Sequence, residues 1–513
     1  MASRMDALWA LILFLLSLFG LISPPPPTTP PPVTPPQAVR PLTEADRLQV
    51  AEQPSGDRAL RTADGRRVLL RGTNVNTLVD HGGARDTVPV TAADGPQARA
   101  LGFNVVRLAV SWSKVAPQPG QLDQAYLDEI RDTARVFTAQ GIYVLLDMHQ
   151  DRYAAGLGRS GDESDGAPAW AALTDGASTA AGSGNHPYYG TAAARQAAKS
   201  FFENREVAGQ PLQDHYADAV RAVAATGRQL GPAFAGIELW NEPVDPWSTD
   251  AYAPDTFSAE RVWPLYRRLI GALRGDGYAG PIWFEPHTTR TWTDDDRVAA
   301  RFSDDDQLVY GPHVYTDVYG GIGSGTAAKI RVSFDNAAAE ARRYGAALVP
   351  TELPGVSGGN WETYRQEQLG HLDRLGIGGI VWVWKQTAAS DYGWGVLKAD
   401  GSLRDDSQIA RDYGRPRVLA HGPELLEQRW ANGVLTVRTR GAGDLDLWDG
   451  AAFAANEPAT GVAGRLTVDD QAPDGATVTV WRGAARLGGS GWGGGRQLRL
   501  RLPAGDHVVR LQP

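Results

Sequence analysis

Leu239-Trp240-Asn241-Glu242-Pro243 ends a short apolar run of strand character, IELWN from position 237. Val349-Pro350-Thr351-Glu352-Leu353 ends a second such run, ALVPTE from position 347. Each glutamate is therefore expected at the carboxyl end of a strand. In parallel sheets these ends gather at one edge, so the two carboxyls are expected to lie close together.

Six more apolar runs accompany these two, and stretches of helical spacing such as YLDEIRDTARVFTAQG and HYADAVRAVAATGRQL separate them. Both faces of the runs are apolar, which is typical of parallel strands covered by helices on each side. Eight alternating units predict a (β/α)8 TIM barrel. The eight expected strands are Val68–Asn74, Asn104–Val110, Ile142–Asp147, Ile237–Asn241, Ile282–Glu285, Leu308–Gly311, Ala347–Glu352 and Gly379–Trp384.

The catalytic barrel is expected over residues 46–415, which exceeds the usual length of about 250 residues, so some loops must be expanded. The largest loop, 151–200, follows the third strand. After Pro416 the pattern changes to short alternating runs such as LTVRT, ATVTVW, QLRLRL and HVVRL, with Gly and Asp turns between them. Residues 416–513 are therefore expected to form a small C-terminal antiparallel β-sandwich.

The N-terminal segment indicates export. Arg4 precedes an apolar stretch from Ala7 to Ile22, and residues 1–23 are expected to be a signal peptide or a signal anchor. A Pro-rich linker, 24–45, follows and is expected to run as extended polyproline II. The protein is thus expected to be secreted or anchored to the outer face of the membrane.

Composition narrows the classes of function. The formal net charge of −9 and the pI of about 5.6 provide no global basic field, so we expect no nucleic-acid partner. The chain has no cysteine, which excludes disulfides, thiolate catalysis and Cys-ligated metals. The 16 tryptophans are compatible with a carbohydrate cleft, because the C–H faces of sugars stack on indole, although tryptophans are also ordinary core residues.

Two carboxyls at one barrel mouth fit the cleavage of a glycosidic bond. One carboxyl protonates the leaving oxygen, and the other stabilises or attacks the sugar cation that develops at the anomeric carbon. The alternative is a structural role, in which Glu242 and Glu352 cap helices or form salt bridges. The pair favours catalysis more than either residue alone.

The polar residues at the other strand ends complete a set that resembles glycoside hydrolase family 5, a retaining barrel family of clan A. The resemblance implies that Asn241-Glu242 supplies the acid/base and that Glu352 is the nucleophile. It also implies that His313 and Tyr315 hydrogen-bond near the nucleophile and that Trp384 forms the floor of the −1 subsite. The substrate-binding residues expected on this basis are Arg107, His149, Asp151, Trp170, Asn241, His313, Tyr315 and Trp384.

Three strings narrow the resemblance to endoglycoceramidases, which release intact glycans from glycosphingolipids: Asp147-Met148-His149-Gln150-Asp151, Asp165-Gly166-Ala167-Pro168-Ala169-Trp170 and His215-Tyr216-Ala217. One departure concerns the first strand, where residues 72–78 lack the lysine that endoglycoceramidases often carry, so the glycan preference stays open. The resemblance implies a monomer that acts on a glycolipid or oligosaccharide at a membrane surface. The alternatives are an endo-β-glucanase or a β-glucosidase of simple glycolipids, and a non-enzymatic glycolipid-binding protein.

Several residues keep a second interpretation. Arg107 is either a sugar contact or an ion-pair partner that orients Glu352, and Trp170 and Trp394 are either substrate contacts or loop-packing aromatics. No His-x-His or His-x-x-x-His spacing supports a metal, so we expect neither a metal nor a cofactor. We also expect Glu242 to have a raised pKa and Glu352 to be kept ionised by donors such as Arg107 and Tyr315.

Overall fold

The computed structural model describes residues 39–79, 87–157, 165–186, 188–248, 255–355, 360–386, 394–403, 412–450, 466–471, 478–482 and 495–512. The predicted leader and most of the Pro-rich linker lie outside these residues. Within them, no helix combines the length and the apolar character that a membrane crossing requires.

The eight predicted strands are all present, and successive strands pair in parallel. Within the stretch 347–352, predicted as the seventh strand, only Ala347–Leu348 forms a strand, β12, which pairs with β11. The strand β13, Leu353–Pro354, directly follows this stretch and pairs with β14. In turn, β14 pairs with β4. The fold is therefore mixed α/β, with the strands in the predicted order. Their bounds are β4 Arg71–Leu78, β5 Val105–Ser111, β6 Tyr143–His149, β9 Phe234–Glu238, β10 Ile282–Phe284, β11 Leu308–Tyr310, β12 Ala347–Leu348, β13 Leu353–Pro354 and β14 Gly379–Trp382.

The first predicted strand differs from the structure in its bounds. Arg67–Val68 forms a separate strand, β3, which pairs with β2 and with β17 near the C-terminus. The parallel strand β4 starts at Arg71 and extends to Leu78. The preceding strands β1, Leu48–Glu52, and β2, Arg58–Thr62, pair antiparallel.

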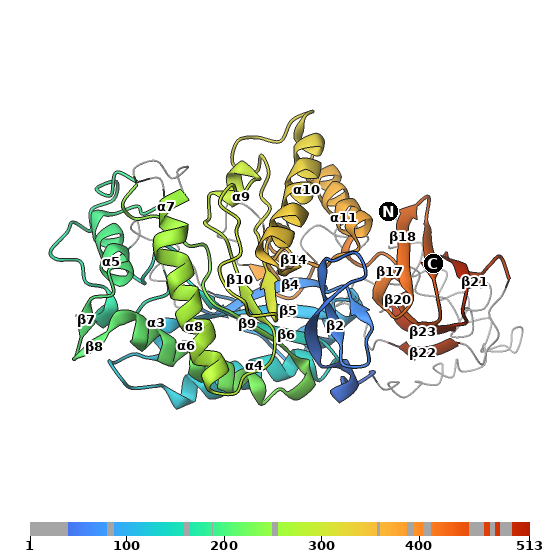
Figure 1. The fold of residues 1–513 in the computed structure, drawn as a ribbon, viewed down its shortest axis with the longest axis horizontal. Coiled ribbons are helices and arrows are strands. Elements are labelled where there is room, and N and C mark those ends of the chain that lie inside the picture. The colour runs from blue at the N-terminus through green and yellow to red at the C-terminus, as the bar shows by residue number, and fades with distance from the viewer. Residues whose placement is uncertain are drawn as a thin grey trace, which may run out of the picture. The chain divides into compact units, whose positions relative to one another are not determined.

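Helices flank the parallel strands, as Figure 1 shows for α4, α6, α8, α10 and α11. The two stretches with helical spacing quoted above, 126–141 and 215–230, overlap α4 and α6 over most of their length, and each extends two or three residues past the end of its helix. The helices are α2 Asp94–Ala100, α3 Trp112–Val115, α4 Gln124–Thr138, α5 Ala192–Phe202, α6 Leu212–Arg228, α7 Asp255–Phe257, α8 Trp263–Gly275, α9 Arg290–Thr293, α10 Thr326–Tyr344 and α11 Trp361–Leu375. Shorter helical turns are η1 Glu44–Asp46, η2 Ala169–Ala171, η3 Gly231–Ala233 and η4 Ser258–Val262.

Helix α4 illustrates why these segments are helical. Asp123 caps its first turn by accepting a hydrogen bond from the backbone N–H of Tyr126. The buried side chains Tyr126, Ile130, Ala134 and Phe137 recur every three or four residues and therefore form one face. That face packs into the main hydrophobic core, together with apolar residues of β5 and β6.

The C-terminal region contains two antiparallel sheets, as the alternating sequence pattern predicts. One sheet has the order β17-β20-β23-β22 and the other has the order β18-β19-β24-β21. Leucines and valines from both sheets share one hydrophobic core. The strands are β17 Arg417–His421, β18 Glu424–Ala431, β19 Val434–Arg440, β20 Gly443–Trp448, β21 Leu466–Val468, β22 Val478–Arg482, β23 Arg496–Leu502 and β24 Asp506–Leu511. Two-residue strands elsewhere are β7 Glu206–Val207, β8 Gln210–Pro211, β15 Lys385–Gln386 and β16 Leu397–Lys398.

The two regions are continuous through backbone and side-chain contacts. Strand β17 pairs antiparallel with β3, so the first C-terminal sheet extends the sheet that contains the parallel strands. Buried Asp373 of α11 accepts hydrogen bonds from Arg71, Arg415 and Gln428. The domain boundary at 415/416 stays a prediction.

Candidate active site

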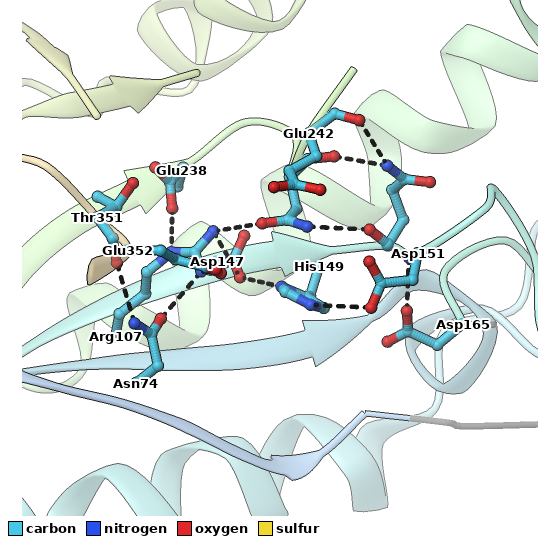
Figure 2. Close-up of polar contacts among 12 residues, drawn as sticks. Asn74, Arg107, Asp147, His149, Asp151, Asp165, Glu238, Glu242, Thr351 and Glu352 are labelled. Carbon is cyan, nitrogen blue, oxygen red and sulfur yellow. Dashed lines mark hydrogen bonds and ion pairs between the residues drawn. The ribbon is translucent and has the colours of Figure 1, made fainter. Parts of the chain in front are cut away.

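The functional side chains lie at the carboxyl ends of the parallel strands, where the sequence predicts them. Glu242 follows β9 by four residues, and Glu352 lies between β12 and β13. Figure 2 shows Arg107 beside Glu352. From Arg107, a chain of polar contacts continues through Asp147 and His149 to Asp151 and Asp165.

The backbone at Glu242 has a left-handed conformation with φ 43°, which is uncommon for a residue with a side chain. Two neighbours hold it there. The side-chain amide of Gln150 donates to the carbonyls of Asn241, at 2.6 Å, and Glu242, at 3.1 Å. The N–H of Glu242 donates to Oε2 of Glu285 at 3.0 Å. The direction of the Glu242 carboxyl therefore depends on side chains from β6 and β10.

The two glutamates share a histidine. One carboxylate oxygen of Glu242, one of Glu352 and a ring nitrogen of His313 all lie within 4.8 Å of one another. Nδ1 of His313 is 2.9 Å from Oε1 of Glu242 and 3.5 Å from Oε2 of Glu352. Retaining glycosidases place their two carboxyls about 5 to 5.5 Å apart, whereas inverting enzymes need room for a water between them. The close approach here fits the retaining arrangement.

Glu352 is held from both sides. Its Oε2 accepts a hydrogen bond from the hydroxyl of Tyr315 at 2.8 Å, and its Oε1 accepts one from Nη1 of Arg107 at 2.9 Å. These are the donors that the sequence predicts. Burial raises the pKa of Glu352 to about 7, and the positive charges of His313 and Arg107 only partly offset this rise. The expectation that these donors keep Glu352 ionised stays a prediction.

The chain around Glu352 is fixed by its neighbours. Asn74 of β4 donates from Nδ2 to the carbonyl of Thr351 at 2.9 Å, and the hydroxyl of Thr351 donates to the carbonyl of Gly311 at 2.7 Å. A Cβ on Gly311 would come within 2.9 Å of Thr351 and Glu238, so only glycine fits. The nucleophile candidate thus lies on a segment bonded to strands on both sides.

Arg107 is the centre of the buried charge network and has no exposed surface. Its guanidinium contacts four carboxylates, those of Asp147, Glu238, Glu285 and Glu352. Burial raises the pKa of Glu238 to about 8, and the positive charge of Arg107 only partly offsets this rise. The interpretation of Arg107 as a sugar contact is therefore wrong, and the alternative that it orients Glu352 is supported.

Asn241 is also buried and bonded within the protein. Its Oδ1 accepts from Nη2 of Arg107 at 2.8 Å, and its Nδ2 donates to the carbonyl of Gln150 at 3.0 Å. The amide orientation is thus set before any substrate arrives. One N–H of the amide remains for a further acceptor.

His149 and Asp151 lie at the end of β6, beside the predicted loop. Nδ1 of His149 is 2.7 Å from Oδ2 of Asp147, and Nε2 is 3.7 Å from Oδ2 of Asp151. Burial alone would lower the pKa of His149, but the Asp147 carboxylate raises it well above the ordinary value. The ring of His149 stacks on Trp382, with centroids 5.4 Å apart and planes 10° apart.

Two tryptophans that the sequence assigns to the substrate lie elsewhere. Trp384 is 1% exposed and packs edge-on against Phe103, and its indole N–H donates to Asp94 at 2.7 Å. Trp384 is therefore a core residue. The tryptophan that contacts His149 is Trp382, which lies two positions earlier and is half-buried. Regular alternation along a strand would place positions 382 and 384 on the same face. The strand β14 ends at Trp382, so the direction of Trp384 depends on the backbone beyond the strand, which the sequence pattern does not give.

Trp170 is likewise a packing residue. Its indole N–H donates to the carbonyl of Ala116 at 2.8 Å, and its ring meets Trp112 and His215 edge-on. The loop-packing alternative is therefore supported. Trp394, by contrast, is in edge contact with Tyr315, with centroids 5.6 Å apart.

Sequence reasoning missed four residues of the network: Asp147, Glu238, Glu285 and Trp382. Glu238 and Glu285 each lie within or at the end of an expected apolar strand, where an acidic residue is costly unless it is paired. That signal was available, but the partner Arg107 lies on another strand and only the folded structure identifies it.

Among the residues that the structure describes, three groups of acidic residues and histidines have ligand atoms within 4.8 Å of one another. They are His149-Asp151-Asp165, Glu242-His313-Glu352 and Asp147-Glu238-Glu285. In the second group Nδ1 of His313 already faces both glutamates, and in the third Arg107 contacts all three carboxylates. Cations of the protein itself therefore neutralise these two groups. The expectation of no metal stays a prediction.

The curated proteins similar to this chain include two endoglycoceramidases. Endoglycoceramidase I of Rhodococcus hoagii (strain 103S) is 32% identical over 237 residues, which is 44% of this chain and 44% of that protein. Endoglycoceramidase of Cyanea nozakii is 27% identical over 279 residues, which is 47% of this chain and 50% of that protein. The chain thus spans about half the length of these curated relatives.

A solved structure of an endogalactoceramidase is similar over nearly the whole chain. The TM-score is 0.71 at 27% sequence identity, and the match covers 91% of this chain and 99% of that chain. The family model described as "Cellulase (glycosyl hydrolase family 5)" matches residues 62–388. This match covers more than half of the 513 residues and includes both glutamates, and we conclude that the chain belongs to glycosyl hydrolase family 5.

Proposed function

We propose that this chain is a retaining endo-β-glycosidase that hydrolyses the bond between glycan and ceramide in glycosphingolipids. The observation that carries the proposal is the close approach of the Glu242 and Glu352 carboxylates, within 4.8 Å, on strand ends of a family 5 chain. The names of the curated relatives, both endoglycoceramidases, support the substrate class.

In the first step, an oxygen of Glu352 attacks the anomeric carbon while the bond to the ceramide oxygen breaks. Glu242 donates its proton to that oxygen, so the lipid leaves as a neutral alcohol. Tyr315 and Arg107 fix the two oxygens of Glu352 before the attack, so little reorganisation is needed when the bond forms.

In the second step, Glu242, now a carboxylate, takes a proton from water, and the water oxygen attacks the same carbon. The bond to Glu352 breaks, and the product has the β-configuration of the substrate. His313, which faces both carboxyls, stabilises negative charge on either glutamate as the charge moves between them.

The proposal includes a closed (β/α)8 barrel. It is supported by the parallel pairing of successive strands from β4 to β11. It is also supported by the stretch 347–354, in which β12 pairs with β11 and β13 pairs with β14, and by the pairing of β14 with β4. Closure brings strands four and seven, and with them Glu242 and Glu352, to one mouth.

We further propose that the substrate is taken from a membrane or micelle. The apolar N-terminal stretch and the Pro-rich linker support this, since an anchored enzyme on a stalk reaches a bilayer surface. Tyr319, an exposed aromatic at 59%, stacks on Tyr315 with centroids 6.1 Å apart, so an exposed aromatic ring lies close to the nucleophile. Each buried lipid methylene contributes about 0.8 kcal/mol.

The alternative is an endo-β-glucanase or a β-glucosidase of simple glycolipids, and the cellulase description of the family model favours keeping it. The discriminating experiment measures kcat/KM for a ceramide-linked glycan and for the same glycan on a small soluble aglycone, at constant detergent. We expect the ceramide substrate to be preferred. Equal values, or faster cleavage of cello-oligosaccharides, would exclude the glycolipid assignment and leave the glycosidase assignment intact.

Proton NMR of the first product formed tests the retaining mechanism separately. We expect the β-anomer before mutarotation sets in. An initial α-anomer would contradict the role of Glu352 as nucleophile and would require a water between the carboxyls. Binding without any product release would support the non-enzymatic alternative.

A further inference from the structure

We infer that Glu285, at the end of β10, is a positioning residue for Glu242: it holds the backbone of the acid/base and the ring of His313 in place against it. The inference rests on the proposed function in one respect, that Glu242 acts as the acid/base. It does not depend on which glycan or lipid is cleaved.

The contacts of Glu285 converge on the catalytic groups. Its Oε2 accepts from the backbone N–H of Glu242 at 3.0 Å and lies 3.2 Å from Nε2 of His313. Its Oε1 accepts from Nη2 of Arg107 at 2.9 Å. Its own carbonyl accepts from the hydroxyl of Tyr266 at 3.0 Å, and the side chain is 2% exposed. Glu285 is thus rigidly held and contacts the supports of both glutamates.

The first role concerns the backbone. Glu242 has φ 43°, and a residue with a side chain is strained in the left-handed region unless the surroundings compensate. A hydrogen bond from its N–H to a buried carboxylate is charge-assisted and favours this conformation. Without it, the backbone relaxes toward the ordinary region and the carboxyl turns away from the leaving oxygen.

The second role concerns His313. Three carboxyls face its ring: Glu242 and Glu352 near Nδ1, and Glu285 near Nε2. A neutral imidazole has one N–H and one lone pair, so one nitrogen would present a lone pair to a carboxylate. The arrangement therefore favours an imidazolium. Burial alone would lower the pKa of His313, but Glu285, Glu352 and Glu242 raise it well above the ordinary value.

A purely structural role is the competing explanation, since Glu285 also neutralises Arg107. A variant of Glu238 distinguishes the positioning role from the structural role. Glu238 is a buried carboxyl that pairs with Nε of Arg107, as Glu285 pairs with Nη2, and none of its hydrogen bonds or ion pairs among the described residues goes to Glu242 or His313. Glu238→Gln is therefore the matched control for the loss of a carboxyl that pairs with Arg107.

The kinetic test compares two β-lactosides that differ only in the leaving group. An alkyl leaving group needs protonation by Glu242, whereas dinitrophenolate leaves without it. For Glu285→Gln we expect kcat/KM on the alkyl lactoside to fall about 100-fold, and on the dinitrophenyl lactoside less than about 10-fold. For Glu238→Gln we expect the two values to fall by the same factor. Equal losses in Glu285→Gln, or none, would overturn the inference.

A second measurement does not need turnover. In protein with ¹⁵N-labelled histidines, His313 is assigned by comparison with a His313→Gln variant, and its ring nitrogens are followed from pH 5 to 9. We expect both nitrogens to stay protonated in the wild type, and one to lose its proton within this range in Glu285→Gln. An unchanged titration of His313 would overturn the inference. If the wild type cleaved neither lactoside, the result would count against the proposed function. The titration of His313 would then still test whether Glu285 holds His313 in place.

Discussion

Arg107 donates a hydrogen bond from Nη1 to Oε1 of Glu352 across 2.9 Å, and the two side chains are only 0% and 8% exposed. The arginine comes from β5 and the glutamate from the segment between β12 and β13, so the contact crosses the parallel sheet. Because the guanidinium fork is planar and rigid, it fixes the orientation of the carboxylate as well as its charge.

This contact predicts that Arg107→Lys damages both stability and activity. A lysine keeps the charge but cannot reach Glu238, Glu285, Asp147 and Glu352 together. We expect the free energy of unfolding to fall by about 3 kcal/mol. Urea unfolding measures it, with Arg135→Lys on the exposed face of α4 as a control that changes it by less than about 1 kcal/mol. Unchanged stability in Arg107→Lys would contradict the central role of the guanidinium.

The hydroxyl of Tyr315 should matter for chemistry more than for folding. Tyr315→Phe removes the 2.8 Å hydrogen bond to Oε2 of Glu352, and we expect kcat to fall about 10- to 100-fold. Tyr310→Phe is the control, because its hydroxyl donates at 2.7 Å to Glu340 of α10, which takes no part in the site. We expect Tyr310→Phe to lower the melting temperature and keep kcat. Equal kcat values in the two variants would argue against the contact.

The assignment of the two glutamates predicts distinct losses. Glu242→Gln and Glu352→Gln should each reduce hydrolysis of natural substrate by several orders of magnitude with circular dichroism unchanged. Azide should restore turnover of an activated substrate by Glu352→Ala and give a glycosyl azide of inverted configuration. Near wild-type turnover in either Gln variant would show that the residue has been assigned the wrong role.

Trp382, the last residue of β14, and Trp384, two positions later, should separate binding from folding. Trp382→Ala removes the ring stacked on His149, and we expect kcat/KM to fall at least about 10-fold while the melting temperature changes little. Trp384→Phe loses the hydrogen bond to Asp94, and we expect lower stability with a smaller kinetic effect. If Trp384→Phe lowered kcat/KM more than Trp382→Ala did, Trp384 would be the tryptophan that contacts the substrate.

Buried His421 predicts a specific acid sensitivity. Burial lowers the pKa of His421 from 6.5 to about 4, so it binds fewer protons in the folded state than in the unfolded state. Its contribution to stability is therefore complete above pH 6.5 and is lost as the pH falls toward 4. Between pH 6.5 and 4.5, the unfolding free energy of the wild type relative to His421→Asn should fall by roughly 2 kcal/mol.

His507 provides the comparison of opposite sign. Its hydrogen bond to Asp469 raises its pKa, so its contribution is complete below pH 6.5 and is lost as the pH rises through the folded-state value. The difference between the wild type and His507→Asn should accordingly shrink on going from pH 6 to pH 8. A pH-independent difference for both variants would contradict the two assignments.

The sequence alone determined the order of elements and the residues at the strand ends. Apolar runs of strand length, separated by stretches of helical spacing, predict the eight parallel strands because burial and periodicity are local properties of the chain. The same patterns located Glu242, Glu352, His313 and Tyr315, since each follows a recognisable run.

Only the tertiary structure decided which charges meet. After Asp147, the nearest acidic partner of Arg107 along the sequence is Glu238, which is more than 130 residues away. Glu352 is 245 residues away, and no local pattern encodes either pairing. The choice of Trp382 over Trp384 depends on where β14 ends and on how the chain continues after it, and the raised pKa of Glu352 depends on burial by distant segments. Glu285, visible in the sequence only as an acid at a strand end, acquires its place in the site because β10 lies beside β9. Charge pairing, strand ends and desolvation are consequences of long-range packing, and therefore they had to be read from the folded chain.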